Sequence, residues 1–578
     1  MKKTLTLALS SAAILTANAQ SLPEAIKLTD KEQFEKATSS FKALLAAAPQ
    51  NAEAWFYFGE NYWENERSDS AEYCYRMAVG ADGKFPLGHV GLGKALWSQG
   101  RKAEAQAEFD KAITNATDKA NKYPKSVQGH TYRELGEAVA QGQGKDLLKA
   151  QEYIAKAIEL DPKDPETYVL KGDVLFEQNP RDGSTPLENY KTAINMDALN
   201  AKPVSRKAFM YYRAKNYPAS IEEYTNAITI DPLFAPAYRG RAEAYFMTRD
   251  FDKATADMNK YLELNKGNVS ARIRNAQFLF LVKKYDESLA EIQALGQANV
   301  KNVVLKRIEA YDLTEKGDFE NALKKMDEYM ADQPEDKRIS LDYEYLGKIH
   351  QGLVPKVSMP APPPVPVPGG VPVPPPLPVL VNHDSIAGEM FLKAAQMDKS
   401  KENLFVDAAK AFAKGKSFDK AIGALREKIA AGKPETNDYY YLGDIANKGK
   451  RWMTADSAWA TYTERNAGAY QGYKFRARAQ NGLDSLEAKS FLAKPYYDTM
   501  LAKMKPEEKE KYKSDVEEAL NYLALYYLYN KEAKDLAKAK CYFLKVQALN
   551  AGTSITEQVN NTFLKMKELK DLAPGTCD

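Results

Sequence analysis

The residue types that most often carry out metal or nucleophilic chemistry are few in this chain. Its four histidines, His89, His130, His350 and His383, all stand more than five residues apart. No pair of them has the spacing of zinc ligands, and the three cysteines do not have it either. The sequence also lacks the strand-to-helix elbow or glycine loop that would present a catalytic nucleophile. We therefore expect no metal, no cofactor and no enzymatic activity.

Two of the histidines flank a proline-rich insertion. From Pro355 to Pro378 the chain has 12 prolines in 24 residues, with His350 before them and His383 after them. Because proline has no amide donor, this tract is expected to join neither a helix nor a sheet and to be polyproline II or disordered. If the tract loops out, the two histidines approach each other. The tract is either a tolerated loop or a tether for another protein.

A third pattern is an aspartate followed by serine or threonine and then an apolar residue. It occurs at Asp69-Ser70-Ala71, Asp384-Ser385-Ile386, Asp456-Ser457-Ala458, Asp484-Ser485-Leu486 and Asp498-Thr499-Met500. The pattern resembles the O-glycosylation acceptor of some gut and oral bacterial periplasmic proteins. Several of these triplets stand where a helix should begin, and there the aspartate or serine would cap free amides instead. Helix capping and glycosylation are the two interpretations.

The rest of the sequence is one helical unit that recurs almost from end to end. Residues 201–234 contain two helical patterns, and Pro232 stands where the second must end. Small Ala208 opposite small Ser220 lets two antiparallel helices approach closely. The small residue of the first helix marks each repeat, at Gly59, Gly93, Gly136, Gly172, Ala208, Ala242, Ala276, Ala310, Gly347, Ala409, Gly443 and Ala477. Six of the steps between these markers are 34 residues long.

This unit resembles the tetratricopeptide repeat. The family pattern W-x2-L-G-x2-Y followed by A-x3-F is matched by Trp55, Phe58, Gly59 and Tyr62 with Ala71, Tyr75 and Ala78. The resemblance covers roughly residues 22–550 and implies an all-α, right-handed superhelical solenoid of about 12–14 helical hairpins. Because repeats of this family bind very different partners, the resemblance implies a binding scaffold without identifying the partner.

The resemblance also implies which side chains face the concave groove. Four places after the marker residue stand six aromatic residues, Trp63, Trp97, Phe176, Tyr212, Phe246 and Phe280. Phe56, Phe209 and Arg239 should face the same groove. The idealised repeat of the family itself favours an aromatic residue four places after the marker. These aromatic side chains therefore either pack between repeats or contact a partner.

The first 20 residues differ from everything that follows. Lys2 and Lys3 precede an apolar stretch, and Ala17-Asn18-Ala19 is an A-x-A cleavage site. These features are typical of a secretory signal peptide that is cleaved after Ala19. The signal peptide resembles those of bacteria, so we expect the mature protein in the periplasm. It could also be attached peripherally to the outer membrane there. No later stretch approaches about 20 apolar residues, so no transmembrane span is expected.

The C-terminal end and the cysteines complete the expectations. Thr556 to Leu572 should form one amphipathic helix that caps the array. Cys74 should be buried, and Cys541 and Cys577 either pair, which an oxidising compartment permits, or remain two free thiols.

The charges are nearly balanced, 81 basic against 78 acidic, without long runs of one sign. Nothing in them argues for nucleic acid.

These features divide the chain into a signal peptide at 1–19, a repeat array at 20–353, the proline-rich insertion at 354–382, a continued array at 383–480 and irregular hairpins with a capping helix at 481–578. The predicted function is a periplasmic scaffold or adaptor that binds another protein or an extended peptide through its concave surface. Two alternatives are an accessory subunit of an outer-membrane assembly, secretion or nutrient-uptake complex, and a glycan-binding solenoid whose tyrosines stack on sugars.

Overall fold

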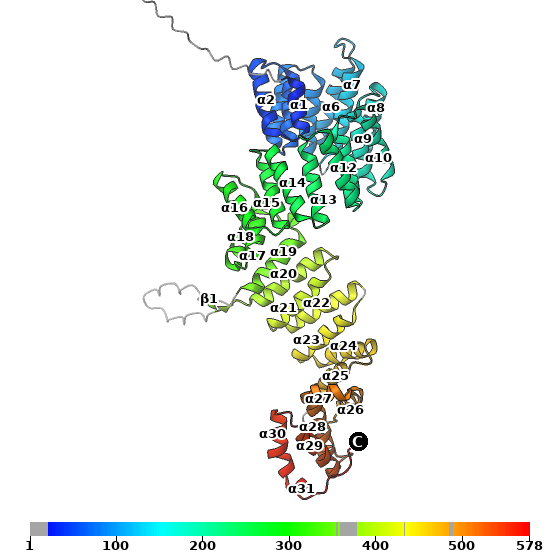
Figure 1. The fold of residues 1–578 in the computed structure, drawn as a ribbon, viewed down its shortest axis with the longest axis vertical. Coiled ribbons are helices and arrows are strands. Elements are labelled where there is room, and N and C mark those ends of the chain that lie inside the picture. The colour runs from blue at the N-terminus through cyan, green and yellow to red at the C-terminus, as the bar shows by residue number, and fades with distance from the viewer. Residues whose placement is uncertain are drawn as a thin grey trace, which may run out of the picture. The chain divides into compact units, whose positions relative to one another are not determined.

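The computed structural model describes residues 21–142, 144–353, 357–358, 379–432, 434–484 and 489–577. These residues form an all-α solenoid of stacked helical hairpins, as the repeats predict, with two short strands (Figure 1). The chain divides into two compact units, one ending at Lys301 and the other beginning at Asn302. The predicted signal peptide lies outside the described residues. None of the helices in the described ranges is both long and apolar enough to cross a bilayer.

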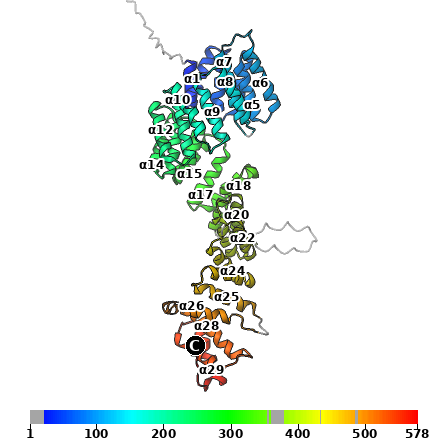
Figure 2. The same cartoon turned by 90° about the vertical axis from the view of Figure 1, so that its right-hand side faces the viewer.

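The N-terminal unit contains eight hairpins. Its helices are α1 (Leu22–Asp30), α2 (Phe34–Ala47), α3 (Ala52–Glu64), α4 (Ser68–Ala81), α5 (Pro86–Ser98), α6 (Lys102–Thr117), α7 (Lys125–Ala140), α8 (Leu147–Leu160), α9 (Pro165–Gln178), α10 (Ser184–Met196), α11 (Ala201–Arg213), α12 (Tyr217–Ile230), α13 (Ala235–Met247), α14 (Phe251–Leu264), α15 (Val269–Leu281) and α16 (Tyr285–Gln297). The two helices of each hairpin pack against each other, and hairpins stack in chain order (Figure 2).

The C-terminal unit continues the pattern with six hairpins and a terminal segment. Its elements are α17 (Val303–Glu315), α18 (Phe319–Asp332), η1 (Glu335–Lys337), α19 (Ser340–Gly352), β1 (Val357–Ser358), β2 (Val379–Leu380), α20 (His383–Met397), α21 (Asn403–Lys414), α22 (Phe418–Ala431), α23 (Thr436–Lys448), α24 (Trp452–Arg465), α25 (Tyr470–Leu483), α26 (Lys494–Lys503), α27 (Pro506–Lys511), α28 (Lys513–Tyr529), α29 (Leu536–Leu549), α30 (Ser554–Asn561), η2 (Phe563–Lys565) and α31 (Lys567–Lys570).

The turn inside a hairpin is built from local backbone chemistry. After α17 the chain enters the left-handed region at Gly317, whose φ is 80°, and its amide donates to the carbonyl of Thr314. This arrangement ends a helix by satisfying its last carbonyls. The next residue, Asp318, then accepts a hydrogen bond from the amide of Asn321 and starts α18. Helix end and helix start are therefore specified by adjacent residues.

The marker residues are the points of closest approach between helices. A Cβ at Gly59 would lie 2.4 Å from the ring of Tyr75, and one at Gly443 would lie 2.5 Å from the ring of Trp459. Both rings are fully buried, so neither can move away cheaply. Small side chains are therefore required at these positions, which confirms the repeat register.

The proline-rich insertion lies inside one hairpin, as predicted. Helices α19 and α20 pack against each other, with the Phe391 ring 2.6 Å from where a Cβ of Gly347 would be. The expectation that no part of the tract joins a sheet is wrong, because β1 pairs antiparallel with β2, Val357 opposite Leu380. The paired residues are not prolines, so they retain the amide donors that a ladder needs. Residues 359–378 lie outside the described ranges.

The predicted single capping helix at Thr556 to Leu572 is wrong. The segment forms two short helices, α30 and α31, joined through the 3-10 turn η2. Because the segment is bent, Val559, Phe563 and Leu569 are all buried in one core with side chains of α28 and α29. A straight helix of this length would carry its ends away from that core, so burial of apolar side chains on both sides of the break favours the bent form.

The cysteines follow one of the two expectations. Cys541 and Cys577 form a disulfide, so the tail is tied to α29. Cys74 is a free thiol and is buried. Burial raises the pKa of the Cys74 thiol to about 12, which makes it a poor nucleophile.

The helix-capping interpretation of the Asp-Ser/Thr triplets is wrong for those on helices. Asp456 lies inside α24 and pairs with Arg476 at 2.9 Å, and Asp498 lies inside α26 and pairs with Lys494 at 2.6 Å. Helix α20 is capped by Asn382, one turn before Ser385. Asp69 and Asp384 lie in the first turns of α4 and α20 without being the N-cap residue, and Asp484 follows the end of α25.

Candidate functional site

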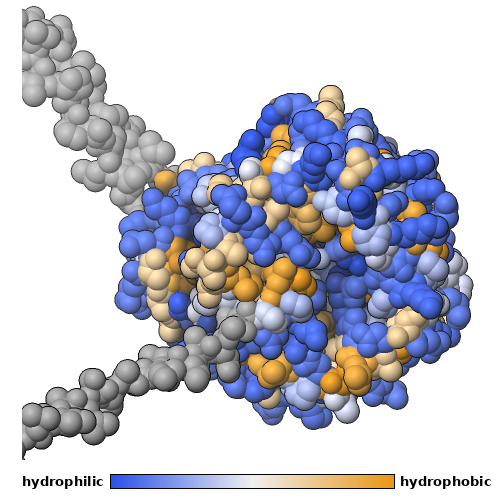
Figure 3. Space-filling model, turned by 90° about the horizontal axis from the view of Figure 1, so that it is seen from above, coloured by the Kyte–Doolittle hydropathy of each residue, from blue (hydrophilic) through white to orange (hydrophobic). Residues whose placement is uncertain are grey.

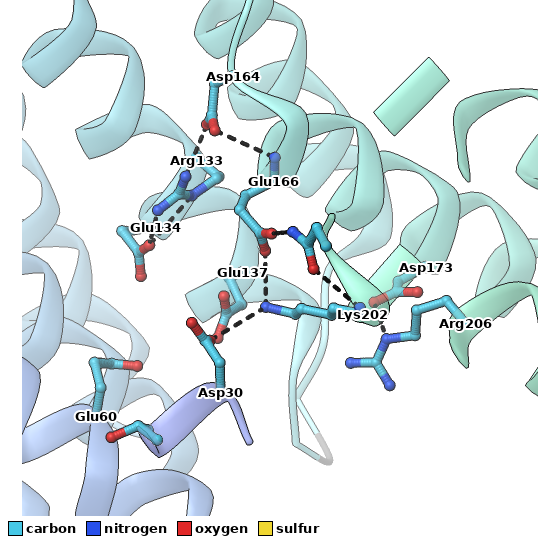
Figure 4. A network of polar contacts seen from close by, with 12 residues as sticks. Asp30, Glu60, Arg133, Glu134, Glu137, Asp164, Glu166, Asp173, Lys202 and Arg206 are labelled. Carbon is cyan, nitrogen blue, oxygen red and sulfur yellow. Dashed lines mark hydrogen bonds and ion pairs between the residues drawn. The ribbon is translucent and has the colours of Figure 1, made fainter. Parts of the chain in front are cut away.

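A row of charged side chains follows the markers of the N-terminal unit. The residue directly after the marker is charged in five of the seven repeats from α3 to α15, at Glu60, Lys94, Glu137, Asp173 and Glu243. We call the set formed by four of these residues and the charged residues near them the inner network; it comprises Asp30, Glu60, Glu64, Lys94, Arg133, Glu134, Glu137, Asp164, Glu166, Asp173, Lys202 and Arg206. Figure 4 labels all of them except Glu64 and Lys94. This set was not predicted from the sequence, although the charged residue after five of the seven markers can be read from it.

One end of the inner network is a lysine held by carboxylates. The Lys94 ammonium lies 2.8 Å from Glu60 and 2.9 Å from Glu137, and its side chain is 2% exposed. Glu64, one helical turn after Glu60, brings a third carboxylate, and the three acids have oxygens within 4.8 Å of one another. This spacing would suit a cation, and the Lys94 ammonium already lies against two of the three groups.

The charge balance at this end is unfavourable for the acids. Burial raises the pKa of Glu60 to about 7, against the opposing effect of Lys94. Burial, and then the neighbouring Glu137, raises the pKa of Glu64 above its usual range. One lysine does not neutralise three carboxylates, so removal from water and mutual repulsion favour their protonated forms. Three carboxylates therefore share one ammonium at this end of the network, and burial favours proton uptake by Glu60 and Glu64.

The other end of the network is held together by ion pairs. Arg133 donates to Glu134 at 2.9 Å and to Asp164 at 2.7 Å (Figure 4). Lys202 contacts Glu166 at 2.8 Å. Although burial opposes ionisation, Lys202 and the other donors lower the pKa of Glu166 to about 2. Glu134, Asp164 and Glu166 each lie against a cation in this way, although carboxylates outnumber cations at this end too once Asp30 and Asp173 are counted.

The N-terminal unit also contacts itself across six repeats. Lys31, in the turn between α1 and α2, lies 2.8 Å from Asp231, in the turn after α12. Beside it, Glu32 pairs with Arg239 at 2.7 Å, and Gln33 donates to the carbonyl of Leu233 at 2.9 Å. These residues are 200 to 207 positions apart, close to six repeats of 34 residues. The superhelix therefore makes one turn in about six repeats and meets its own start.

A second rung of the same junction lies one repeat further on. Asn268 donates to the side chain of Asn65 at 2.8 Å, and Arg274 pairs with Glu66 at 2.6 Å. Both asparagines are buried, Asn65 at 6% exposure and Asn268 at 2%. Buried amides without partners are costly, so their mutual hydrogen bond specifies this contact. We call the two rungs the turn junction.

The predicted groove residues do not form one open row. Phe56 is fully buried, and Trp97 and Phe176 are 5% and 8% exposed, so these three are core residues. Arg239 belongs to the turn junction. Phe209 is the most open aromatic residue of the predicted groove, at 36% exposure.

The remaining four, Trp63, Tyr212, Phe246 and Phe280, are half-buried. Three of them contact the aromatic residue that begins the second helix of their own hairpin, as Tyr212 does with Tyr217 at 5.8 Å between ring centroids. Trp63 instead donates from its indole nitrogen to Gln141 at 2.9 Å. A residue four places after the marker lies at the end of the first helix, where the second helix begins. Packing is therefore part of their role, and contact with a partner stays a prediction for them.

The two histidines beside the insertion do meet, in the C-terminal unit. The Nδ1 atoms of His350 and His383 are 2.9 Å apart and their rings are stacked. Burial, followed by the neighbouring His383, lowers the pKa of His350 to about 4. Only one ring can donate in this contact, so at least one imidazole must be neutral.

Comparisons with known proteins agree with the repeat pattern. A family model described as the tetratricopeptide repeat matches residues 22–86, 58–120 and 210–269. Similar solved structures include the C-terminal part of a TPR repeat-containing protein from Cytophaga hutchinsonii, with 25% identity over 51% of this chain and 100% of that chain and a TM-score of 0.35. A tetratricopeptide repeat protein from Parabacteroides merdae has 18% identity over 49% and 98% of the two chains, with a TM-score of 0.35. No curated protein matches the chain.

These superpositions are partial, so the matched repeats and the hairpins with their small marker residues carry the assignment. The matched ranges contain the markers Gly59, Gly93 and Ala242, and the structure gives a helical hairpin in each of them. Helical hairpins of this family typically act as scaffolds for protein partners. The chain is a tetratricopeptide-repeat protein.

Proposed function

We propose that this chain is a periplasmic scaffold that binds a protein partner, and that a basic, extended segment of the partner lies along the inner network. The observation that carries the proposal is the group of three carboxylates, Glu60, Glu64 and Glu137, that share the single ammonium of Lys94. The network as a whole has eight carboxylates and four cations. A lysine or arginine from a partner would relieve the repulsion that these groups experience when unoccupied.

The compartment is part of the same proposal. The A-x-A site after an apolar stretch favours export, and the disulfide between Cys541 and Cys577 is compatible with an oxidising compartment. We expect osmotic shock to release the protein from cells that express the full chain. The released protein should have Gln20 as its N-terminal residue. Retention in the cytoplasmic fraction would contradict the periplasmic part alone.

The binding part is tested with charge variants of the mature chain. The double variant Glu60→Gln with Glu64→Gln keeps side-chain size and hydrogen bonding but removes charge. We expect it to capture at least about tenfold less partner from envelope extract than the wild type. Capture by the wild type should also weaken as salt rises from about 50 to 300 mM, because salt screens the attraction between the carboxylates and the basic segment of the partner.

A matched control removes two charges elsewhere. Glu152 and Glu222 are exposed on second helices of the same unit, so Glu152→Gln with Glu222→Gln gives the same net charge without touching the inner network. The control should capture as the wild type does. Equal loss in both double variants, or no loss in either, would reject the inner network as the binding surface.

A further inference from the structure

A pair of histidines with a specific geometry lies beside the proline-rich insertion, in the C-terminal unit. His350 is in the last turn of α19, and His383 is the first residue of α20, so one hairpin holds both side chains. A defined geometry of this kind is more informative about a ligand than the hydrophobic residues in Figure 3, which form separate patches among hydrophilic ones.

The distance between the two histidines suits two ligands of one metal ion. Their Nδ1 atoms are 2.9 Å apart. Metal–nitrogen bonds to imidazole are about 2.0–2.1 Å long, so two nitrogens that meet at an ion with an angle of about 90–109° are about 2.9–3.4 Å apart. The observed distance lies at the lower end of this range, which corresponds to neighbouring ligands of a square-planar or octahedral ion. A small rotation of the two rings is therefore enough to replace the present hydrogen bond by an ion.

The protonation state of the pair also suits a metal. In the present contact one Nδ1 atom donates and the other accepts, so at least one imidazole is neutral. The neutral imidazole is the form that binds metal ions. Both histidines are half-buried, so an ion can reach them from solvent.

The groups next to the pair already have partners. Asp384 pairs with Lys414 at 2.8 Å, and Asn382 donates to the carbonyl of Gly415 at 2.9 Å. Within the described ranges no third histidine, cysteine or carboxylate joins the two nitrogens. The protein therefore supplies two ligands and leaves the other positions of the ion to water or to a group of another molecule.

Two imidazoles select one class of metal ion. Nitrogen ligands suit copper, nickel and zinc, whereas magnesium and calcium require oxygen ligands. We propose that His350 and His383 bind a divalent transition-metal ion through their Nδ1 atoms. The bound ion joins the end of α19 to the start of α20, on the two sides of the insertion. Spacing along the sequence predicts no such site, because the two residues are 33 positions apart.

Calorimetric titration of the mature chain, without an affinity tag, tests the proposal. We expect one Ni²⁺ per chain to bind saturably, Cu²⁺ to bind more tightly, Mn²⁺ to bind more weakly, and Mg²⁺ to give no signal. His350→Gln and His383→Gln each keep a polar side chain and remove one ligand. Each should weaken Ni²⁺ binding at least about tenfold, because even residues that only orient metal ligands change the affinity by about 10–100-fold.

A matched control changes a histidine in the N-terminal unit. His130 is also half-buried, and its Nε2 atom lies 3.1 Å from Glu134. His130→Gln should bind Ni²⁺ as the wild type does. The proposed metal site shares no residue with the inner network, so either proposal can fail without the other.

Hydrogen exchange on the wild-type chain tests the site without any substitution. Ni²⁺ should slow exchange at residues 346–353 and 383–387, because a ligand stabilises the state that it binds. The proposal is overturned if no saturable uptake occurs at about 1 mM Ni²⁺, if His130→Gln loses as much affinity as His350→Gln, or if Ni²⁺ leaves exchange near the pair unchanged.

Discussion

The two units use the same 34-residue repeat and differ in what lies beside the marker residue. Four places after the marker, six of seven repeats in the N-terminal unit have an aromatic residue, whereas in the C-terminal unit the equivalent residues are Thr314, Gln351, Ala413, Asn447 and Asn481. Directly after the marker, the N-terminal unit has the mainly acidic row of the inner network. The C-terminal unit has Tyr311, Lys348, Lys410, Asp444 and Arg478 instead.

The turns differ as well. In the N-terminal unit Gln33 and Asn65, in the turns of the first two hairpins, are buried against residues six repeats away. At the positions of Glu32 and Glu66, which pair with Arg239 and Arg274, the C-terminal unit has Lys416 and Lys450 instead. Extensive helix packing there runs between near neighbours in the chain. Closure of the N-terminal unit therefore involves turn residues that pair with each other across six repeats.

The largest expected effect tests the aromatic row. Trp97→Ala should lower the free energy of unfolding by about 3–5 kcal/mol, because a side chain that is 5% exposed is removed from a packed core. Asn481→Ala, at the equivalent and exposed position of the C-terminal unit, should change it by less than about 0.5 kcal/mol. Urea unfolding measures both. A neutral Trp97→Ala would mean that the position four places after the marker is a surface position in both units.

The turn junction is tested by Asn268→Ala. The substitution leaves Asn65 buried without its partner, which costs about 1–3 kcal/mol. Hydrogen exchange should accelerate at residues 65–67 and 265–268, because these are the two turns that this rung holds together. Asn321→Ala, in the C-terminal unit, removes an exposed side chain and serves as the control. Unchanged exchange at both sets of turns would show that closure does not depend on the junction.

The units should respond to acid in opposite directions. The folded-state pKa of Glu60 is about 7, above its usual 4.5, so its contribution to stability is full below pH 4.5 and is lost as the pH rises toward 7. The folded-state pKa of His350 is about 4, below its usual 6.5, so stability is full above pH 6.5 and is lost as the pH falls toward 4. From pH 7.5 to 5 the N-terminal unit should gain about 1–2 kcal/mol and the C-terminal unit should lose about as much, after allowance for screening.

Local hydrogen exchange at the two pH values measures this difference unit by unit. The variants Glu60→Gln and His350→Asn should each reduce the response of their own unit only. A common direction of change in both units, with the variants behaving like the wild type, would contradict the assignment to these two groups. Carboxylates such as Glu166, whose pKa is lowered to about 2, contribute only below this window.

The smallest effect is expected at the insertion. Deleting Met359–Leu377 should leave the melting temperature nearly unchanged, because the closure entropy of a long loop depends only weakly on its length. Helices α19 and α20 already pack directly, with Phe391 against Gly347. Calorimetry on the deleted chain provides the measurement. A fall of more than about 5 °C would show that the tract contributes to the stability of the C-terminal unit.

The sequence alone determined the hairpins, their register and the place of the insertion. Small residues such as Gly59 and Gly347 recur because two helices within one hairpin must approach closely, which is a local requirement with a local signal. The sequence left open whether Cys541 and Cys577 form a disulfide or stay two free thiols, because sequence spacing does not give the distance between their Cβ atoms. The bent C-terminal cap was missed, since amphipathic spacing at Val559 and Phe563 does not show where a helix must break to reach its core.

Only the tertiary structure decided which aromatic residues are buried and where the superhelix closes. Phe56 and Phe209 were predicted for the same groove, and one is fully buried while the other is 36% exposed. The pairing of Asn65 with Asn268 joins residues 203 positions apart. Small rotations between neighbouring hairpins accumulate over six repeats before they bring these turns together, and no single repeat contains a pattern that records the sum.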